Sequence, residues 1–189
     1  MSLRDRMAYI PWIHHRRSYR LAGYDYTSPG AYFVTVCAHR KRCGFGRVVR
    51  HEMRLNRYGR IVQNEWCHLA EARPQVALDE FRVMPNHFHA LLIITAPGTP
   101  PSAATPSLIR KFGDAETGSL STIVGQFKAN VTKAIHTLRA ELYPGTAPVR
   151  VWQGRFYDHI VRDEDELNGI RRYIIENPQH WSVDQNYVP

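Results

Sequence analysis

The sequence predicts an α+β fold in which helices pack against a small antiparallel sheet. Short β-rich runs alternate with longer stretches whose apolar residues recur every three to four positions, the spacing of amphipathic helices. The expected order is strand, helix, strand, strand, helix, strand, helix, which is the order of a ferredoxin-like domain. With 189 residues, the chain is long enough for one such domain with a full core.

The first half of the chain contains one strand, one helix and a hairpin. Residues 31–37 form a β-rich run, and residues 56–72 have the apolar spacing of a helix that ends before Pro74. The inward side of that helix is expected to hold Ile61, Val62, Trp66 and Leu69. A strand over 76–84 meets the apolar run that follows it at the tight turn Pro85-Asn86, which predicts a hairpin.

The second half begins with a long helix and a last strand region. Ser119 or Ser121 begins the helix, which reaches about Tyr143. Its apolar side comprises Leu120, Val124, Phe127, Val131, Ile135, Leu138 and Leu142. The last strand region is expected over 149–153 and is open to extension over 156–161.

A final helix is expected over 164–177. Asp163 is suited to its N-cap, and Glu166 would supply the reciprocal half of a capping box. Pro178 disfavours a helical conformation at Asn177, so we expect the helix to end there.

The composition favours a polyanionic partner. Lys and Arg number 25 against 17 for Asp and Glu, which gives a formal charge of +8, although a merely soluble basic protein would also have such a balance. The three cysteines show neither zinc-binding spacing nor the framework of a secreted protein. The cysteine pattern, together with the lack of an apolar run that reaches the ~18 residues of a membrane helix, leads us to expect a cytoplasmic protein. Its basic charge leads us to expect that it works on the nucleoid.

The expected organisation is a single domain over 30–182. Residues 1–29 form a basic N-terminal extension, residues 96–118 a surface loop or insertion rich in Pro, Gly, Thr and Ser, and residues 183–189 a tail. The run 14–20 mixes basic and aromatic residues, which suits binding along a nucleic-acid backbone as well as a solvated tail.

The segment His87-Phe88-His89 carries the first functional motif. Side chains in a strand alternate between the two faces, so the two imidazoles should project side by side and could bind one cation. The apolar run Ala90–Ile94 that follows indicates a buried, rigid strand. The alternative is a pair of polar residues on a hydrated face of the sheet.

Tyr173 and Asn177 form the second motif. They lie four residues apart on the expected final helix, so the phenol and the amide oxygen could reach one point beside the apolar stripe. A half-buried packing residue and a helix cap are the alternative interpretation of this pair.

The two motifs belong to a longer series of segments that together resemble a known protein family. These segments are Tyr32–Cys37, Val83–Leu91, Trp152–His159 and Arg171–Pro178, in order within a region from about Arg16 to Trp181. On them the chain resembles the HUH superfamily of single-tyrosine transposases, and most closely the REP-associated tyrosine transposases. The ferredoxin-like order predicted above agrees with the core of that superfamily.

The resemblance implies a metal-dependent endonuclease that nicks and rejoins single-stranded DNA near hairpin repeats through a covalent phosphotyrosine. By position, Tyr173 matches the nucleophile, and His87, His89 and Asn177 match the ligands of a divalent cation, Mg²⁺ or Mn²⁺. Tyr157 is a rival nucleophile. The implied partner is single-stranded or hairpin DNA with REP-like palindromes, bound by a monomer or a homodimer. No dedicated general base is evident.

Basic and aromatic residues are candidates for DNA contact. They are Arg16, Arg17, Arg20, Arg40, Lys41, Arg42, Lys128, Trp152, Arg155, Tyr157, Arg171 and Arg172. Two other functions remain open at this point. One is a non-catalytic nucleic-acid-binding module that stacks bases on Tyr32 and Phe33. The other is a metal-assisted hydrolase that uses water and does not need Tyr173.

Overall fold

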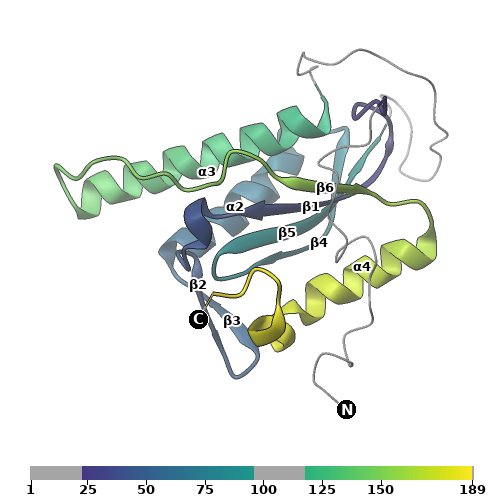
Figure 1. The fold of residues 1–189 in the computed structure, drawn as a ribbon. Helices are drawn as coiled ribbons and strands as arrows, with labels where there is room; N and C mark the ends of the chain where they lie inside the picture. The colour runs from purple at the N-terminus through teal and green to yellow at the C-terminus, as the bar shows by residue number, and fades with distance from the viewer. Residues whose placement is uncertain (1–22, 96–117, 189) are drawn as a thin grey trace.

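The computed structural model describes residues 23–95 and 118–188, so the basic run at 14–20 and nearly all of the 96–118 segment lie outside the described residues. Its principal sheet has four strands in the spatial order β4-β5-β1-β6 (Figure 1). These strands are β1 (Gly30–Cys37), β4 (Val76–Val83), β5 (His87–Ile94) and β6 (Tyr157–Ile160). The α-helices of the described ranges are α2 (Arg57–Glu71), α3 (Leu120–Leu142) and α4 (Glu164–Glu176).

The sheet is antiparallel throughout, and its topology is ferredoxin-like. Strand β5 pairs with β1 on one side and β4 on the other, and β1 also pairs with β6. The chain order β1, α2, β4, β5, α3, β6, α4 is the order that the sequence predicted. The α+β prediction is therefore confirmed, and the histidine strand β5 lies inside the sheet rather than at an edge.

The two faces of the sheet are covered by different helices. Helices α2 and α3 lie over one face and α4 over the other (Figure 1). On β5, Phe88, Ala90 and Leu92 belong to the larger core beneath α2 and α3. Leu91 packs on the opposite face with residues of α4, and the alternation of a strand places both histidines on that face as well.

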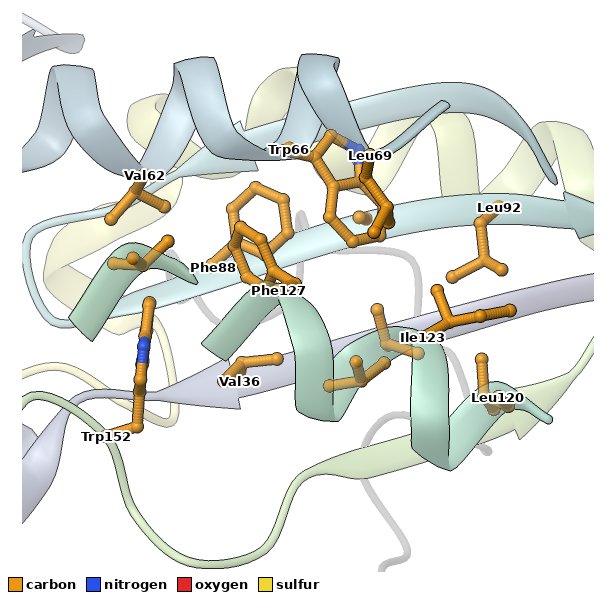
Figure 2. Packing of buried hydrophobic residues seen from close by; sticks show 14 of the residues in the cluster. Val36, Val62, Trp66, Leu69, Phe88, Leu92, Leu120, Ile123, Phe127 and Trp152 are labelled. Carbon is orange, nitrogen blue, oxygen red and sulfur yellow. The ribbon is translucent and has the colours of Figure 1, made fainter. Parts of the chain in front are cut away.

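The larger core is built around aromatic residues from three elements. Figure 2 shows Trp66 of α2, Phe127 of α3 and Phe88 of β5 packed together. Their ring centroids lie 5.0 to 5.1 Å apart, in the range where aromatic pairs attract each other. All three side chains are fully buried, and this close packing makes β5 rigid on the face that α2 and α3 cover.

Helices α2 and α3 begin at the residues that the sequence predicted. Asn56 caps α2 by accepting from the backbone N–H of Gly59, and Ser119 caps α3 by accepting from that of Thr122. One expectation is wrong, because Leu142 is 40% exposed rather than part of the buried stripe. Helix α3 continues past the end of the sheet, so its last turns do not lie over a strand (Figure 1). None of the helices in the described ranges is both long and apolar enough to cross a membrane.

Helix α4 has the predicted N-cap and a different C-terminus. Asp163 accepts from the backbone N–H of Glu166 at 2.8 Å, but the Glu166 carboxylate accepts from the backbone of Arg162 rather than from that of Asp163. Asn177 keeps helical dihedrals, contrary to the expected effect of Pro178. The chain continues directly into the 3₁₀ helix η3 (Asn177–Val183), whose early position tolerates a residue without an N–H.

Two parts of the backbone differ from the sequence prediction. The strands β2 (Gly46–Val49) and β3 (Glu52–Leu55) form a hairpin that was not predicted. Its turn residues Arg50 and His51 both have positive φ, which sequence reasoning normally assigns to Asn-Gly.

The predicted strand at 149–153 is not formed. That segment is joined to the sheet by one bridge, between Trp152 and Ala38. The amine of Lys128 on α3 donates to the backbone carbonyls of Gln153 and Gly154, at 2.7 and 3.0 Å, and so draws this segment toward α3.

Candidate active site

The two histidines form the centre of the candidate site. His87 and His89 are both fully buried on β5, and their ring centroids lie 4.4 Å apart. Their placement on one face follows from the period of two in a strand. The alternative of two polar residues on a hydrated face is therefore excluded, because no water-exposed surface remains on either side chain.

The neighbouring Asn86 determines which ring nitrogen of His87 carries the hydrogen. The amide nitrogen of Asn86 donates to the backbone carbonyls of Lys41 and Asn186, at 3.1 and 2.7 Å. Its oxygen consequently faces Nδ1 of His87, at 2.9 Å. Since an amide oxygen only accepts, Nδ1 carries the proton and the lone pair is on Nε2. A metal-binding histidine is prepared in this way.

Thr35 and Phe33 on β1 orient His89. The Thr35 hydroxyl lies 2.9 Å from Nδ1 of His89, and the Phe33 ring stacks against the imidazole with a centroid distance of 5.4 Å. These contacts leave Nε2 directed at the hydroxyl of Tyr173, 3.4 Å away.

Helix α4 contributes Tyr173 to the site, and its C-cap residue contributes Asn177. Tyr173 is 7% exposed and Asn177, one turn later, is 1% exposed. The Asn177 amide nitrogen donates to the carboxylate of Asp184 at 3.1 Å. A carboxylate only accepts, so this contact fixes which end of the amide is the oxygen. That oxygen is buried and has no hydrogen-bond partner among the described residues.

Asp184 is the site residue that the sequence reasoning missed. One of its carboxylate oxygens accepts from Asn177 and from the Tyr173 hydroxyl, the latter at 3.4 Å, and the other accepts from the backbone N–H of Asn186 at 2.6 Å. Helix η3 turns the chain back toward β5 and so carries Asp184 into the site. Residues 183–189 were expected as a tail, and that short aperiodic stretch gives no sequence signal for a buried carboxylate.

The cluster has the composition of a divalent-cation site. One ligand atom from each of His87, His89 and Asp184 can be chosen so that all lie within 4.8 Å of one another. The three residues could therefore hold a metal ion. Imidazole nitrogen with a carboxylate oxygen is a common donor set for divalent cations, and the unsatisfied Asn177 oxygen adds a fourth potential donor. The side chains therefore fit the expected ion.

Several predicted DNA contacts have other partners in the structure. The prediction that Lys128 is available for phosphate is wrong. Its amine donates to two backbone carbonyls, and burial lowers the pKa of that amine. Trp152 is 7% exposed and packs on Phe127 in the core, so it cannot stack on a base. Tyr157 is half-buried under α4, where it packs against Phe33.

Arg171 is paired with a carboxylate on β4. Its Nε donates to Asp79 at 2.9 Å, and a terminal nitrogen donates to the other carboxylate oxygen of Asp79. Chiefly through this hydrogen bonding, Arg171 lowers the pKa of Asp79. The guanidinium therefore has a structural partner, which leaves only its remaining surface for DNA.

The other predicted contacts are accessible or lie outside the described residues. Arg40, Arg42, Arg155 and Arg172 are exposed. Lys41 donates to the backbone carbonyl of Gln185 at 3.2 Å. Arg16, Arg17 and Arg20 lie outside the described residues. DNA contact by the exposed arginines stays a prediction.

Comparison with other proteins gives the family of the chain. No family model matches it. A protein of Haemophilus influenzae, itself uncharacterized, is 38% identical over 185 residues, which is 95% of this chain and 97% of that protein. The chain belongs to the same family.

Solved structures identify the fold. A REP-associated tyrosine transposase bound to a REP hairpin matches with a TM-score of 0.54 and 19% identity, over 87% of this chain and 73% of that one. The chain therefore has the fold of a REP-associated tyrosine transposase, as the sequence resemblance predicted. A candidate transposase of Deinococcus radiodurans gives a TM-score of 0.43 at 16% identity, over 84% of this chain and 96% of that one.

Proposed function

We propose that the chain is a metal-dependent, single-tyrosine HUH transposase that nicks and rejoins single-stranded DNA. One observation carries this proposal. The Tyr173 hydroxyl lies 3.4 Å from Nε2 of His89 and 3.4 Å from the carboxylate of Asp184, two groups of the candidate metal cluster. A nucleophile placed among metal ligands is an arrangement suited to phosphoryl transfer.

Tyr173 is the nucleophile in this proposal. Its phenol oxygen forms a bond to phosphorus, and the bond from phosphorus to the 3′ oxygen of the preceding nucleotide breaks. The proton lost by the phenol is balanced by the proton gained at the released 3′ hydroxyl. The following strand stays attached to the enzyme through its 5′ phosphate. Because one phosphodiester replaces another, the reverse step rejoins DNA without an energy source.

His87 and His89 would hold the cation together with Asp184 or Asn177. A bound divalent cation polarises a phosphate oxygen and neutralises charge on the transferred group. The hydrogen bond from His87 to Asn86 and that between His89 and Thr35 keep the imidazoles oriented for this role. The burial of all four side chains excludes water, which strengthens each electrostatic interaction in the site.

The proposed substrate is single-stranded DNA that folds into a hairpin. The formal charge of +8 suits a polyanion, and Arg40, Arg42, Arg155 and Arg172 offer exposed cations for its backbone. The solved transposase that shares the fold was bound to a REP hairpin, which supports a hairpin as the first substrate to test.

A base-stacking module receives no support from the sheet. The aromatic residues expected to stack bases, Tyr32 and Phe33, are both 0% exposed. Helices cover both faces, whereas recognition modules that stack bases on a sheet need one open face. The proposed function therefore uses the site under α4 and not a sheet surface.

The experiment incubates the protein with labelled single-stranded hairpins drawn from the DNA that flanks its own gene, with Mg²⁺ or Mn²⁺, and separates the products on a denaturing gel. We expect a protein-linked DNA band that disappears with EDTA and in Tyr173→Phe. Tyr24→Phe is the matched control, since it removes a phenol outside the site. Cleavage without a protein-linked band that persists in Tyr173→Phe would indicate a hydrolase that uses water, and a protein-linked band that persists would indicate Tyr157 as the nucleophile. Binding without any adduct would indicate a non-catalytic binding protein.

A further inference from the structure

A row of four side chains crosses the sheet beneath α4. Strand pairing aligns His89 of β5 with Arg82 of β4 on one side and with Thr35 of β1 on the other, and Thr35 with Tyr157 of β6. Directly paired residues of an antiparallel ladder project to the same face. The hydrogen bond between Thr35 and His89 demonstrates this for one pair. Arg82 therefore projects to the face that carries the candidate active site.

The side chain of Arg82 is partly buried. Its Nε is shielded from solvent and has no hydrogen-bond partner among the described residues. No ion pair of Arg82 occurs in that part of the chain either. A buried guanidinium N–H without an acceptor destabilises the fold, because hydration is lost and no hydrogen bond replaces it. Such a group is suited to binding an acceptor that the described residues do not provide.

Arg171 differs from Arg82 in having a carboxylate partner. Arg82 lies on β4 and Arg171 on α4, which packs over the same face of the sheet. The planar fork of Arg171 donates to both carboxylate oxygens of Asp79. Phosphate offers the same pair of acceptors to such a fork. Asp79 is already engaged by Arg171, so it does not serve Arg82 in the same way.

We propose that Arg82 binds the phosphate that Tyr173 attacks, through Nε–H and a terminal N–H to its non-bridging oxygens. This inference rests on the proposed function and adds a phosphate-binding residue to it. The cross-strand neighbours Arg82 and His89 have Cβ atoms about 5 Å apart, so one phosphate can contact both the guanidinium and the groups around His89. The contact holds charge of the transferred group in a site from which water is excluded.

The test uses Arg82→Met, Arg82→Lys and Arg139→Met in the full chain with the hairpin that gives the most adduct. Arg139 lies in the last turn of α3, on the opposite side of the sheet from α4, and serves as the control (Figure 1). We expect Arg82→Met to form adduct about 100-fold more slowly, with hairpin affinity close to native. Lys keeps the charge without the fork, so Arg82→Lys should fall between the two.

A second substrate separates phosphate binding from a structural role. It carries a methylphosphonate at the scissile position, in which a methyl group replaces one non-bridging oxygen and the linkage is uncharged. If Arg82 binds that oxygen, the difference between the native chain and Arg82→Met should nearly vanish on one methylphosphonate stereoisomer. A merely misfolded variant would be impaired equally on both substrates, and thermal unfolding of each variant checks folding directly.

The outcomes distinguish this inference from the proposed function. If the native chain forms no adduct with any hairpin, the proposed function fails. If the native chain forms adduct and Arg82→Met matches it, or loses equally on both substrates, the assignment to Arg82 is overturned and the function stands. If Arg82→Met does not fold, the same comparison with Arg82→Lys decides the matter.

Discussion

The hydroxyl of Tyr173 and the carboxylate of Asp184 lie 3.4 Å apart, although η3 and eleven positions of sequence separate them. The contact is long for a hydrogen bond, as is common for catalytic groups before substrate binds. The same carboxylate oxygen holds the amide of Asn177. Asp184 therefore links Tyr173, Asn177 and the histidine pair into one cluster.

Asp184→Asn is expected to weaken divalent-cation binding by at least about tenfold. The substitution keeps the shape of the side chain and removes the negative charge that a cation would neutralise. Titration with Mn²⁺ in a calorimeter measures the effect. Asp165→Asn, in the exposed first turn of α4, is the control. An unchanged affinity in Asp184→Asn would exclude the carboxylate as a ligand.

Asn86→Leu is expected to weaken the same cation binding about 10- to 100-fold without removing any ligand. The variant loses the acceptor that fixes the proton on Nδ1 of His87 and leaves two backbone carbonyls without their donor. Asn64→Leu, on the exposed side of α2, controls for the change in side chain. Native affinity in a folded Asn86→Leu protein would show that His87 needs no such orientation.

Arg171→Met is expected to lower the free energy of unfolding by about 1–2 kcal/mol at neutral pH. Arg171 holds the pKa of Asp79 below its ordinary 3.8. A lowered aspartate pKa stabilises the folded state above the ordinary value, and this stabilisation is lost as the pH falls through the lowered pKa. Urea unfolding of both proteins should therefore give curves that converge in acid.

The control for that measurement is Arg172→Met, since Arg172 lies next in sequence with an exposed side chain. It should unfold like the native chain at every pH. A gap between Arg171→Met and the native chain that stays constant below pH 3.8 would contradict the role given to Asp79.

Local periodicity was sufficient for most of the fold. The period of two over His87 to Leu91 places both imidazoles under α4, and the helical spacing of Tyr173 and Asn177 brings Tyr173 to His89 and Asn177 to the same carboxylate that Tyr173 contacts. These relationships depend on neighbours a few residues apart, so the sequence displays them directly.

Long-range contacts explain what the sequence did not display. Asp184 enters the site because Asn86 holds the carbonyl of Asn186, a contact across 100 positions. The turn at Arg50 and His51 adopts positive φ without glycine, and His51 contacts the backbone of Gln179 on η3. Tertiary contacts of this kind override local preference and leave no periodic trace.

Peptide mass spectrometry can detect whether Tyr173 becomes covalently joined to DNA. The protein is incubated with hairpin DNA and Mn²⁺, digested with nuclease and protease, and searched for a tyrosine that carries a nucleotide 5′ phosphate. We expect this modification on the peptide that contains Tyr173, and its absence when EDTA is present. A modification on Tyr157 instead, or cleaved DNA without any modified tyrosine, would show that Tyr173 is not the nucleophile.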